Sequence, residues 1–126
     1  MSKTTVIEAM QKRVLYFDGA MGTMVQKHGL QAGESPEIFS LTHPEVIAEI
    51  HRSYLNAGAD IVTANTFGAN AHKLKATGYS PEEIISASVR LAKKEAITAS
   101  SDEMQKFVAL DIGPIGELLE PMGTLS

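Results

Sequence analysis

Three apolar stretches of this chain each end abruptly in small, polar, turn-forming residues, and this arrangement constrains the fold most strongly. The loops that follow them are Asp-Gly-Ala-Met-Gly-Thr at 18–23, Asn-Thr-Phe-Gly at 65–68 and Asp-Ile-Gly-Pro at 111–114. Near-continuous hydrophobicity before each loop is typical of strands covered on both faces in a parallel sheet. Because β/α proteins build their sites at the carboxyl ends of such strands, we expect the three loops to form a site.

Helix-start signals alternate with these strands. Capping-box patterns begin at Thr5, Thr42 and Ser80, and the last two precede amphipathic stretches that reach about residues 58 and 99. Shorter helices are expected at about 21–28 and 69–77, each closed by a glycine. The order predicts a right-handed parallel α/β arrangement. Its expected strands are 14–17, 61–63 and 107–110.

The length of the chain limits what this arrangement can be. A closed (β/α)8 barrel typically needs about 250 residues, and this chain has 126. About three parallel strands leave two unprotected edges and make a poor independent unit. We therefore expect residues 1–126 to form one N-terminal piece of a TIM-type barrel, holding its opening β/α units. The exposed strand edges favour self-association or pairing with a complementary half-barrel.

Composition excludes several classes of function. The formal net charge is −4, and no basic cluster exceeds the Lys93-Lys94 pair, which argues against nucleic acid or an anionic membrane surface as a partner. No apolar run approaches the roughly 20 residues that span a bilayer. The N-terminal stretch lacks the apolar core of a signal peptide, so a cytoplasmic location is expected. The absence of cysteine removes disulfides, thiolate nucleophiles and Cys-based zinc sites.

The first loop combines an acidic side chain with a glycine-rich turn into a helix. Asp18 could receive an ammonium group, while successive backbone N–H groups between Gly19 and Gly22 favour a carboxylate. That pairing suits an amino-acid substrate. The alternative is that Asp18 only caps the turn, which the glycines shape. The candidate substrate-binding residues here are Asp18, Gly19, Ala20, Met21, Gly22 and Thr23.

The second and third loops offer polar groups without a clear acid or base. Asn65 and Thr66 could orient a small polar ligand, or could instead cap the helix that begins near residue 69. Asp111 could line the site, although satisfying loop N–H groups is the favoured role. Gly113 beside a proline predicts a tight, pre-shaped loop.

No self-contained catalytic machinery is evident. The four histidines, His28, His43, His51 and His72, lack the i, i+3 to i+5 pairing of a helical metal site. Surface roles are expected for His43 and for His51, which falls on a helix that mostly faces solvent. No side chains form a nucleophile–base pair, so we expect no catalytic residue and no metal ligand set in this chain.

Taken together, the three loops resemble the N-terminal homocysteine-binding barrel of cobalamin-dependent methionine synthases. The resemblance is carried by residues 13–26 (RVLYFDGAMGTMVQ), 59–70 (ADIVTANTFGAN) and 111–118 (DIGPIGEL), in the same order and spacing, and it covers essentially the whole chain. Three motifs in register are far more specific than any one of them.

The resemblance implies a zinc-dependent methyltransferase that produces methionine from homocysteine. In that family, three cysteines late in the barrel hold zinc, which lowers the thiol pKa of homocysteine and makes its sulfur nucleophilic. The methyl group comes from methylcobalamin, which methyltetrahydrofolate recharges. Asp18 would contact the substrate ammonium, the N–H groups from Gly19 to Thr23 its carboxylate, and Asn65 and Thr66 the pocket wall.

The same resemblance marks what this chain lacks. The zinc cysteines and the cobalamin and folate domains of the family are absent from the 126 residues, so the chain alone is expected to be inactive and to bind neither cofactor. The motifs concern the methyl acceptor, so betaine and S-methylmethionine stay open as donors. A non-catalytic half-barrel that binds an amino acid is the alternative from a different class. A phosphate-binding loop is less favoured, because the P-loop lysine is missing.

Overall fold

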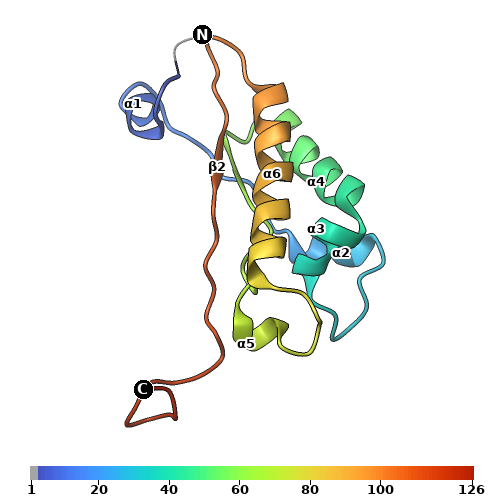
Figure 1. Ribbon diagram of the computed structural model, residues 1–126. Coiled ribbons are helices and arrows are strands. Elements are labelled where there is room, and N and C mark those ends of the chain that lie inside the picture. The colour runs from blue at the N-terminus through green and yellow to red at the C-terminus, as the bar shows by residue number, and fades with distance from the viewer. Residues whose placement is uncertain (1–2) are drawn as a thin grey trace.

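The computed structural model describes residues 3–126, and its centre is a small parallel sheet covered by helices on one face (Figure 1). The two strands are β1 (Ile61–Thr63) and β2 (Phe107–Ala109). Helices α4 (Pro44–Asn56) and α6 (Pro81–Ala99) lie side by side against them. A short helix, α1 (Val6–Met10), lies apart from this layer, near the start of the chain.

The sheet confirms parallel pairing but contains fewer strands than expected. β1 pairs with β2 in the register Ile61–Phe107, Val62–Val108 and Thr63–Ala109. The predicted strand 14–17 is wrong as a regular strand, since only a single parallel bridge joins Phe17 to Ile61. Its hydrogen bonds to β1 are few because the carboxylate of Asp60, rather than a backbone carbonyl, accepts from the N–H of Tyr16.

Asp60 holds the amino-terminal end of the sheet together. Its buried carboxylate accepts from Arg13 Nη1 at 2.8 Å and from the backbone N–H of Tyr16 at 3.0 Å, and Lys106 Nζ lies at 3.5 Å. Its carbonyl oxygen accepts from the N–H of Phe107 at 2.8 Å. One residue thus joins the segment before the first loop to the start of β2.

The hydrophobic core consists of two clusters, one between the sheet and the two long helices and one among helices. One cluster joins β1 to α4 and α6 and contains Leu55, Val62, Ala64, Ala92 and Ala96. A second cluster packs α4 against α2 (Gly22–Lys27) and α3 (Phe39–Thr42), and contains Val25, Phe39, Ile47 and Ile50. Both clusters lie on one side of the sheet, so the helices fix the position of the loops that follow the strands.

The helix predictions are confirmed with two corrections. Thr5 and Ser80 form complete capping boxes with Glu8 and Glu83. The predicted box at Thr42 is wrong, because Thr42 ends α3 and its hydroxyl donates to the carbonyl oxygen of Ile38 at 3.2 Å. The helix expected over 69–77 is a short turn, α5 (Ala71–Leu74). A 3-10 helix, η1 (Pro36–Ile38), precedes α3, and the sequence pattern predicted neither of them.

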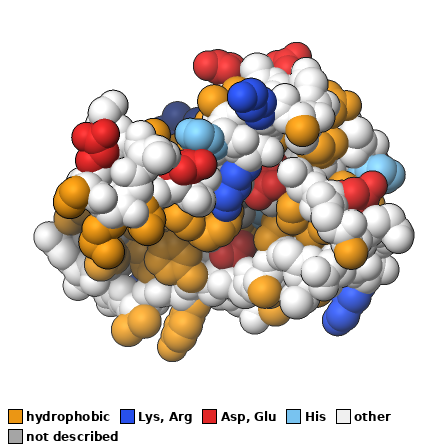
Figure 2. All heavy atoms as spheres, turned by 90° about the horizontal axis from the view of Figure 1, so that it is seen from below, with side chains coloured by type: hydrophobic (Ala, Val, Ile, Leu, Met, Phe, Trp, Pro, Cys, Tyr) orange, Lys and Arg blue, Asp and Glu red, His pale blue; other side chains and the backbone are white. Residues whose placement is uncertain are grey.

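Strand β1 is buried on both faces, as expected, because its successive residues Ile61 and Val62 are both buried, but large apolar side chains in the segments beside the strands are exposed. Tyr16 is 65% exposed and Phe17 is 62% exposed, and Ile112 beyond β2 is 84% exposed. Figure 2 shows hydrophobic side chains gathered at the surface when the molecule is seen from below. Among the described residues, no helix has both the length and the apolar character needed to cross a bilayer.

Candidate functional site

The first loop is attached to β1 by Asp18. Asp18 Oδ1 accepts from Thr63 Oγ1 and Asp18 Oδ2 accepts from the backbone N–H of Thr63, both at 2.9 Å. These two bonds occupy half of the acceptor capacity of a carboxylate, which offers about four lone-pair positions. The half-buried side chain is therefore oriented by β1 and still able to accept from a cationic ligand.

Tyr54 of α4 shapes the glycine turn that follows Asp18. Its hydroxyl donates to the carbonyl oxygen of Ala20 at 2.8 Å, and a Cβ at Gly19 would lie only 2.9 Å from the tyrosine ring. The turn therefore requires glycine because an aromatic side chain packs on it. Within residues 3–126, the backbone N–H groups of Gly19, Ala20 and Met21 donate to no backbone partner. They remain available to an anionic group.

The second loop is held mainly from the side of η1 and α6. Asn65 Nδ2 donates to the carbonyl oxygen of Pro36 at 2.8 Å, and the backbone N–H of Gly68 donates to Glu37 Oε1 at 2.8 Å. Ser88 of α6 donates to the carbonyl oxygen of Asn65 at 3.1 Å. Asn65 and Thr66 are buried, and their side-chain donors are used within the chain.

The third loop lies against the second. Thr66 Oγ1 donates to the carbonyl oxygen of Asp111 at 2.7 Å, and the backbone N–H of Asp111 lies 3.1 Å from the same hydroxyl. The N–H of Gly113 donates to the carbonyl oxygen of Phe67 at 3.1 Å. A Cβ at Gly113 would collide with that oxygen, so the close approach of the two loops depends on glycine.

Five of the ten predicted site residues line one small cavity. It has a volume of about 170 Å³ at the carboxyl end of β1 and is bordered by Asp18, Gly19, Met21, Thr63, Ala64, Asn65, Thr66 and Phe67. Ala20, Gly22 and Thr23 lie on the first loop outside its lining, and Asp111 and Gly113 contribute only through their contacts with the second loop. The first two loops therefore meet as expected.

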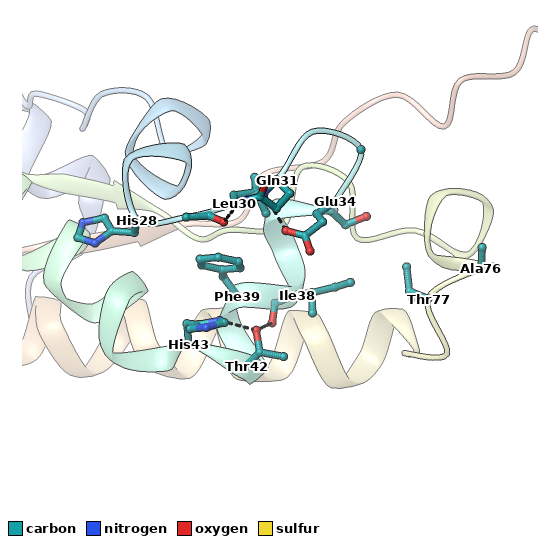
Figure 3. Close-up of a pocket in the computed structure, with 13 residues that line it drawn as sticks. His28, Leu30, Gln31, Glu34, Ile38, Phe39, Thr42, His43, Ala76 and Thr77 are labelled. Atoms are coloured by element: carbon teal, nitrogen blue, oxygen red, sulfur yellow. Dashed lines mark hydrogen bonds between the residues drawn. The ribbon is translucent and has the colours of Figure 1, made fainter.

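A larger cavity of about 520 Å³ lies on the other side of η1 and α3 (Figure 3). Its lining includes Leu30, Ile38, Phe39 and Thr77, but none of the predicted site residues. Figure 3 shows His43 beside Phe39, whose ring it stacks on at a centroid distance of 4.4 Å. Ile38 and Phe39 line this cavity, whereas the preceding Pro36 and Glu37 bond to the second loop of the candidate site.

The predicted surface role of His51 is wrong. It was expected at the surface, but it is fully buried on the inner face of α4, and neither ring nitrogen has a hydrogen-bond partner among the described residues. Burial lowers the pKa of His51, against the opposing attraction of Asp18 and Glu95. Two apolar residues, Ile47 and Ile50, precede it on the same buried face, and this is the pattern that could have revealed its position.

The sequence reading also missed Thr63, Tyr54 and Glu37, which hold the predicted residues in place. Thr63 ends β1 beside the quoted loop, so its position was a usable signal. Tyr54 and Glu37 act from 35 and 31 residues away along the chain, and no local pattern connects them to the glycines they contact.

The described residues do not fit a zinc site. No group of three or more histidine, aspartate or glutamate side chains is placed to hold a metal ion within residues 3–126, and the chain contains no cysteine. No histidine lies in the lining of the small cavity. Consequently, no chemical step is assigned to a metal ion held by these residues.

The site can therefore be described by what it offers. A carboxylate oriented by β1 lies beside backbone N–H groups without partners, at the mouth of a small polar cavity. Such a pairing can bind the zwitterionic end of an amino acid, since the carboxylate accepts from an ammonium and the N–H groups donate to a carboxylate.

The chain aligns with only a small part of each known protein of similar sequence. The chain is 31% identical over 128 aligned positions to the methionine synthase of Mycobacterium tuberculosis, and these positions cover 95% of this chain and 11% of that protein. The chain is also 31% identical to the methionine synthase of Mycobacterium leprae, and the alignment covers 10% of that protein. The chain thus spans about a tenth of these relatives.

Solved structures agree with the sequence comparisons. The metallated form of the homocysteine methyltransferase MmuM from Escherichia coli superposes with a TM-score of 0.73 at 28% identity, over 86% of this chain and 41% of that one. Its oxidised form gives the same TM-score at 29% identity. The family model described as homocysteine S-methyltransferase matches residues 15–126. The chain belongs to the homocysteine S-methyltransferase family.

Proposed function

We propose that this chain forms part of the homocysteine pocket of a methyltransferase that moves a methyl group to the homocysteine thiol and gives methionine. The observation that carries the proposal is the oriented carboxylate of Asp18 at the small cavity, beside the N–H groups of Gly19, Ala20 and Met21. Membership of the family points to homocysteine as the substrate, and this geometry offers a binding place for its amino-acid end.

In this proposal Asp18 binds the substrate ammonium, and the N–H groups from Gly19 to Thr23 bind its carboxylate. The buried Asn65 and Thr66 shape the wall, because their side-chain donors already bond to Pro36 and Asp111. Asp111 and Gly113 support that wall from the third loop. These groups bind and orient the substrate, and none of them performs the methyl transfer.

The proposal places residues 1–126 in one domain, as the opening β/α units of a (β/α)8 barrel in a cytoplasmic protein. The parallel pairing of β1 and β2 and the superposition on MmuM support this placement. The zinc implied by the family resemblance would be held by other parts of a longer protein, because the residues described here do not fit it, and the implied cobalamin by a separate domain. Methylcobalamin recharged by methyltetrahydrofolate is the proposed donor, with betaine and S-methylmethionine as alternatives.

Calorimetric titration of L-homocysteine into the chain tests the binding role. We expect weak binding that does not require zinc, and at least a tenfold loss for Asp18→Asn, because the neutral amide forgoes a charge-assisted contact with the ammonium. Asp102→Asn, at an exposed position, is the matched control and should bind as the wild type does. Equal affinities for the Asp18 and Asp102 variants would refute the assignment of Asp18.

The exposed apolar side chains beside the sheet favour a second proposal, that the chain binds an amino acid without catalysis while associated with a complementary half-barrel or a second copy. Tyr16, Phe17 and Ile112 leave a large apolar area in water, and β2 has no strand on its outer edge within the described residues. Such areas and edges mark interaction sites. Sedimentation at several concentrations should show a concentration-dependent dimer or larger species, whereas a monomer throughout would contradict association with itself.

A further inference from the structure

Glu37 is a buried carboxylate to which the proposed function assigns no role. It is the second residue of η1, only 6% exposed, and it borders neither the small cavity nor the larger one. Burying a carboxylate is costly unless the group forms hydrogen bonds. Its position therefore calls for a specific partner.

That partner is the backbone of the second loop. Glu37 Oε1 accepts from the N–H of Gly68 at 2.8 Å. A Cβ at Gly68 would lie 2.7 Å from the same oxygen, so the carboxylate occupies the space that any other residue would need. Glu37 and Gly68 are therefore matched in both hydrogen bonding and shape.

The segment that carries Glu37 holds the same loop at two further points. The carbonyl oxygen of Pro36 accepts from Asn65 Nδ2 at 2.8 Å. Ser40 Oγ lies 2.7 Å from Ser88 Oγ, and Ser88 bonds in turn to the carbonyl oxygen of Asn65. Two direct hydrogen bonds and one connection through Ser88 thus join residues 36–40 to both ends of the loop.

The loop held in this way forms one wall of the small cavity and contacts the third loop. Thr66 bonds to Asp111, and the carbonyl oxygen of Phe67 accepts from the N–H of Gly113. A displacement of Gly68 would move Phe67, which is its neighbour in the chain. The position of the wall and its contact with the third loop therefore depend on what Glu37 holds.

We propose that Glu37 is a positioning residue, whose carboxylate fixes the backbone at Gly68 and thereby sets the pocket wall formed by Asn65, Thr66 and Phe67. The residue does not touch the ligand in this proposal. The identity of that ligand as homocysteine rests on the proposed function, whereas the positioning of the wall does not.

Amide hydrogen exchange in the unliganded chain tests the positioning directly. For Glu37→Ala we expect exchange to accelerate about tenfold or more at Gly68, because a hydrogen bond to a charged acceptor is lost. Acceleration should extend to Gly113 and Asp111, whose N–H groups bond to the same loop. Glu37→Gln keeps an acceptor oxygen and should stay within about threefold of the wild type.

Glu34→Ala is the matched control for the loss of a loop carboxylate. Glu34 accepts from the N–H of Gln31 at 2.8 Å in an exposed turn, so its removal should leave Gly68 and Gly113 unchanged. Acceleration confined to Gly68 in Glu37→Ala would overturn the proposal, as would a Gln variant that behaves like the Ala variant.

A double substitution tests the match in shape. Gly68→Ala alone should accelerate exchange at Gly113, because its methyl group meets the carboxylate. In the Glu37→Ala background that collision is gone, so the added effect of Gly68→Ala should fall to less than half in logarithmic terms. Strictly additive effects would contradict direct contact between the two residues.

Homocysteine affinity separates the two proposals. If the wild-type chain binds L-homocysteine, Glu37→Ala should weaken binding at least fivefold and Glu37→Gln by less than twofold, at a temperature where every variant is folded. An unchanged affinity in Glu37→Ala would overturn the positioning role. Failure of the wild-type chain to bind would count against the proposed function instead, and the exchange pattern would then decide the role of Glu37.

Discussion

Replacing Asp60 with asparagine should reveal how strongly the amino-terminal end of the sheet depends on one carboxylate. Asp60 accepts from Arg13 Nη1 at 2.8 Å and from the N–H of Tyr16 at 3.0 Å, with Lys106 Nζ at 3.5 Å. An asparagine has one oxygen and one NH₂ group in the same place. Either the Tyr16 N–H or the two cations would therefore face a donor instead of an acceptor.

The expected loss in the free energy of unfolding is about 3 kcal/mol. Removing one partner from a buried ion pair typically costs about 3–5 kcal/mol. The lower end applies because the Arg13 side chain is 30% exposed and can be hydrated after the change. Lys106, only 9% exposed, keeps a bond to the carbonyl oxygen of Ala59 at 2.9 Å. Small domains have only about 5–15 kcal/mol of stability, so this loss is large.

Urea denaturation followed by circular dichroism measures this loss, with Asp102→Asn at an exposed position as the control. The pH dependence gives a second test. Burial opposes ionisation of Asp60, but the hydrogen bonds from Tyr16 and Arg13 and the charges of Arg13 and Lys106 outweigh it, so its pKa is lowered. Its contribution is therefore complete above about pH 4, the usual range of an unfolded aspartate, and is lost as pH falls further.

The stability difference between the wild type and Asp60→Asn should accordingly shrink below about pH 4 while staying constant between pH 5 and 8. The Asp102 variant should track the wild type at every pH. A loss below about 0.5 kcal/mol at pH 7, or a difference that does not shrink in acid, would refute the view that Asp60 carries this end of the sheet.

Three further changes test other parts of the fold. As pH falls from 7.5 to 5, the free energy of unfolding of the wild type should fall relative to that of His51→Leu by up to about 1.4 kcal/mol per pH unit, because burial lowers the pKa of His51 and only the unfolded chain takes up the proton. Denaturation at several pH values checks this, and His72→Leu, at an exposed site, should show no such trend. Ser80→Ala should cost about 1 kcal/mol in thermal unfolding through loss of its cap on α6, and an unchanged Tm would argue against it. Gly113→Ala should cost at least about 1 kcal/mol because its Cβ would meet the second loop, whereas Gly22→Ala, with no atom within 4 Å, should cost nothing in the same urea titration.

Local sequence patterns predicted those elements whose cause is local. Ser80 and the apolar repeat behind it specify α6, and a helix cap depends only on residues three positions apart. The same pattern at Thr42 failed because a preceding short helix, α3, already includes that residue. The hydroxyl then bonds backwards to Ile38 rather than forwards to the next helix. Only His43 separates the two helices, and it takes the N-cap position of α4 without a side-chain hydrogen bond.

The prediction of strands failed where pairing decides the outcome. The residues at 14–17 are as apolar as those of β1, yet only Phe17 forms a bridge. The backbone N–H of Tyr16 donates to the side chain of Asp60 and is therefore not available for strand pairing. The exposure of His51 was misjudged for a similar reason. A helix shows from its sequence which residues share a face, but not how wide the covered face is, and α4 is covered by both α2 and α6.

In the candidate site, too, local features could be predicted from the sequence and long-range contacts could not. Asp18, Asn65 and Thr66 follow strands and could be placed at one edge from the chain order alone, and Asp18 and Asn65 indeed border one cavity. What each side chain does there could not be predicted, because it depends on partners far along the chain. Asn65 looks like a free donor in the sequence but is bonded to Pro36. Asp18 keeps free acceptor positions because the two bonds from Thr63 use only about half of them. The residues most able to bind a ligand are therefore those that the fold leaves unsatisfied, and in this site these are the Asp18 carboxylate and the N–H groups that follow it.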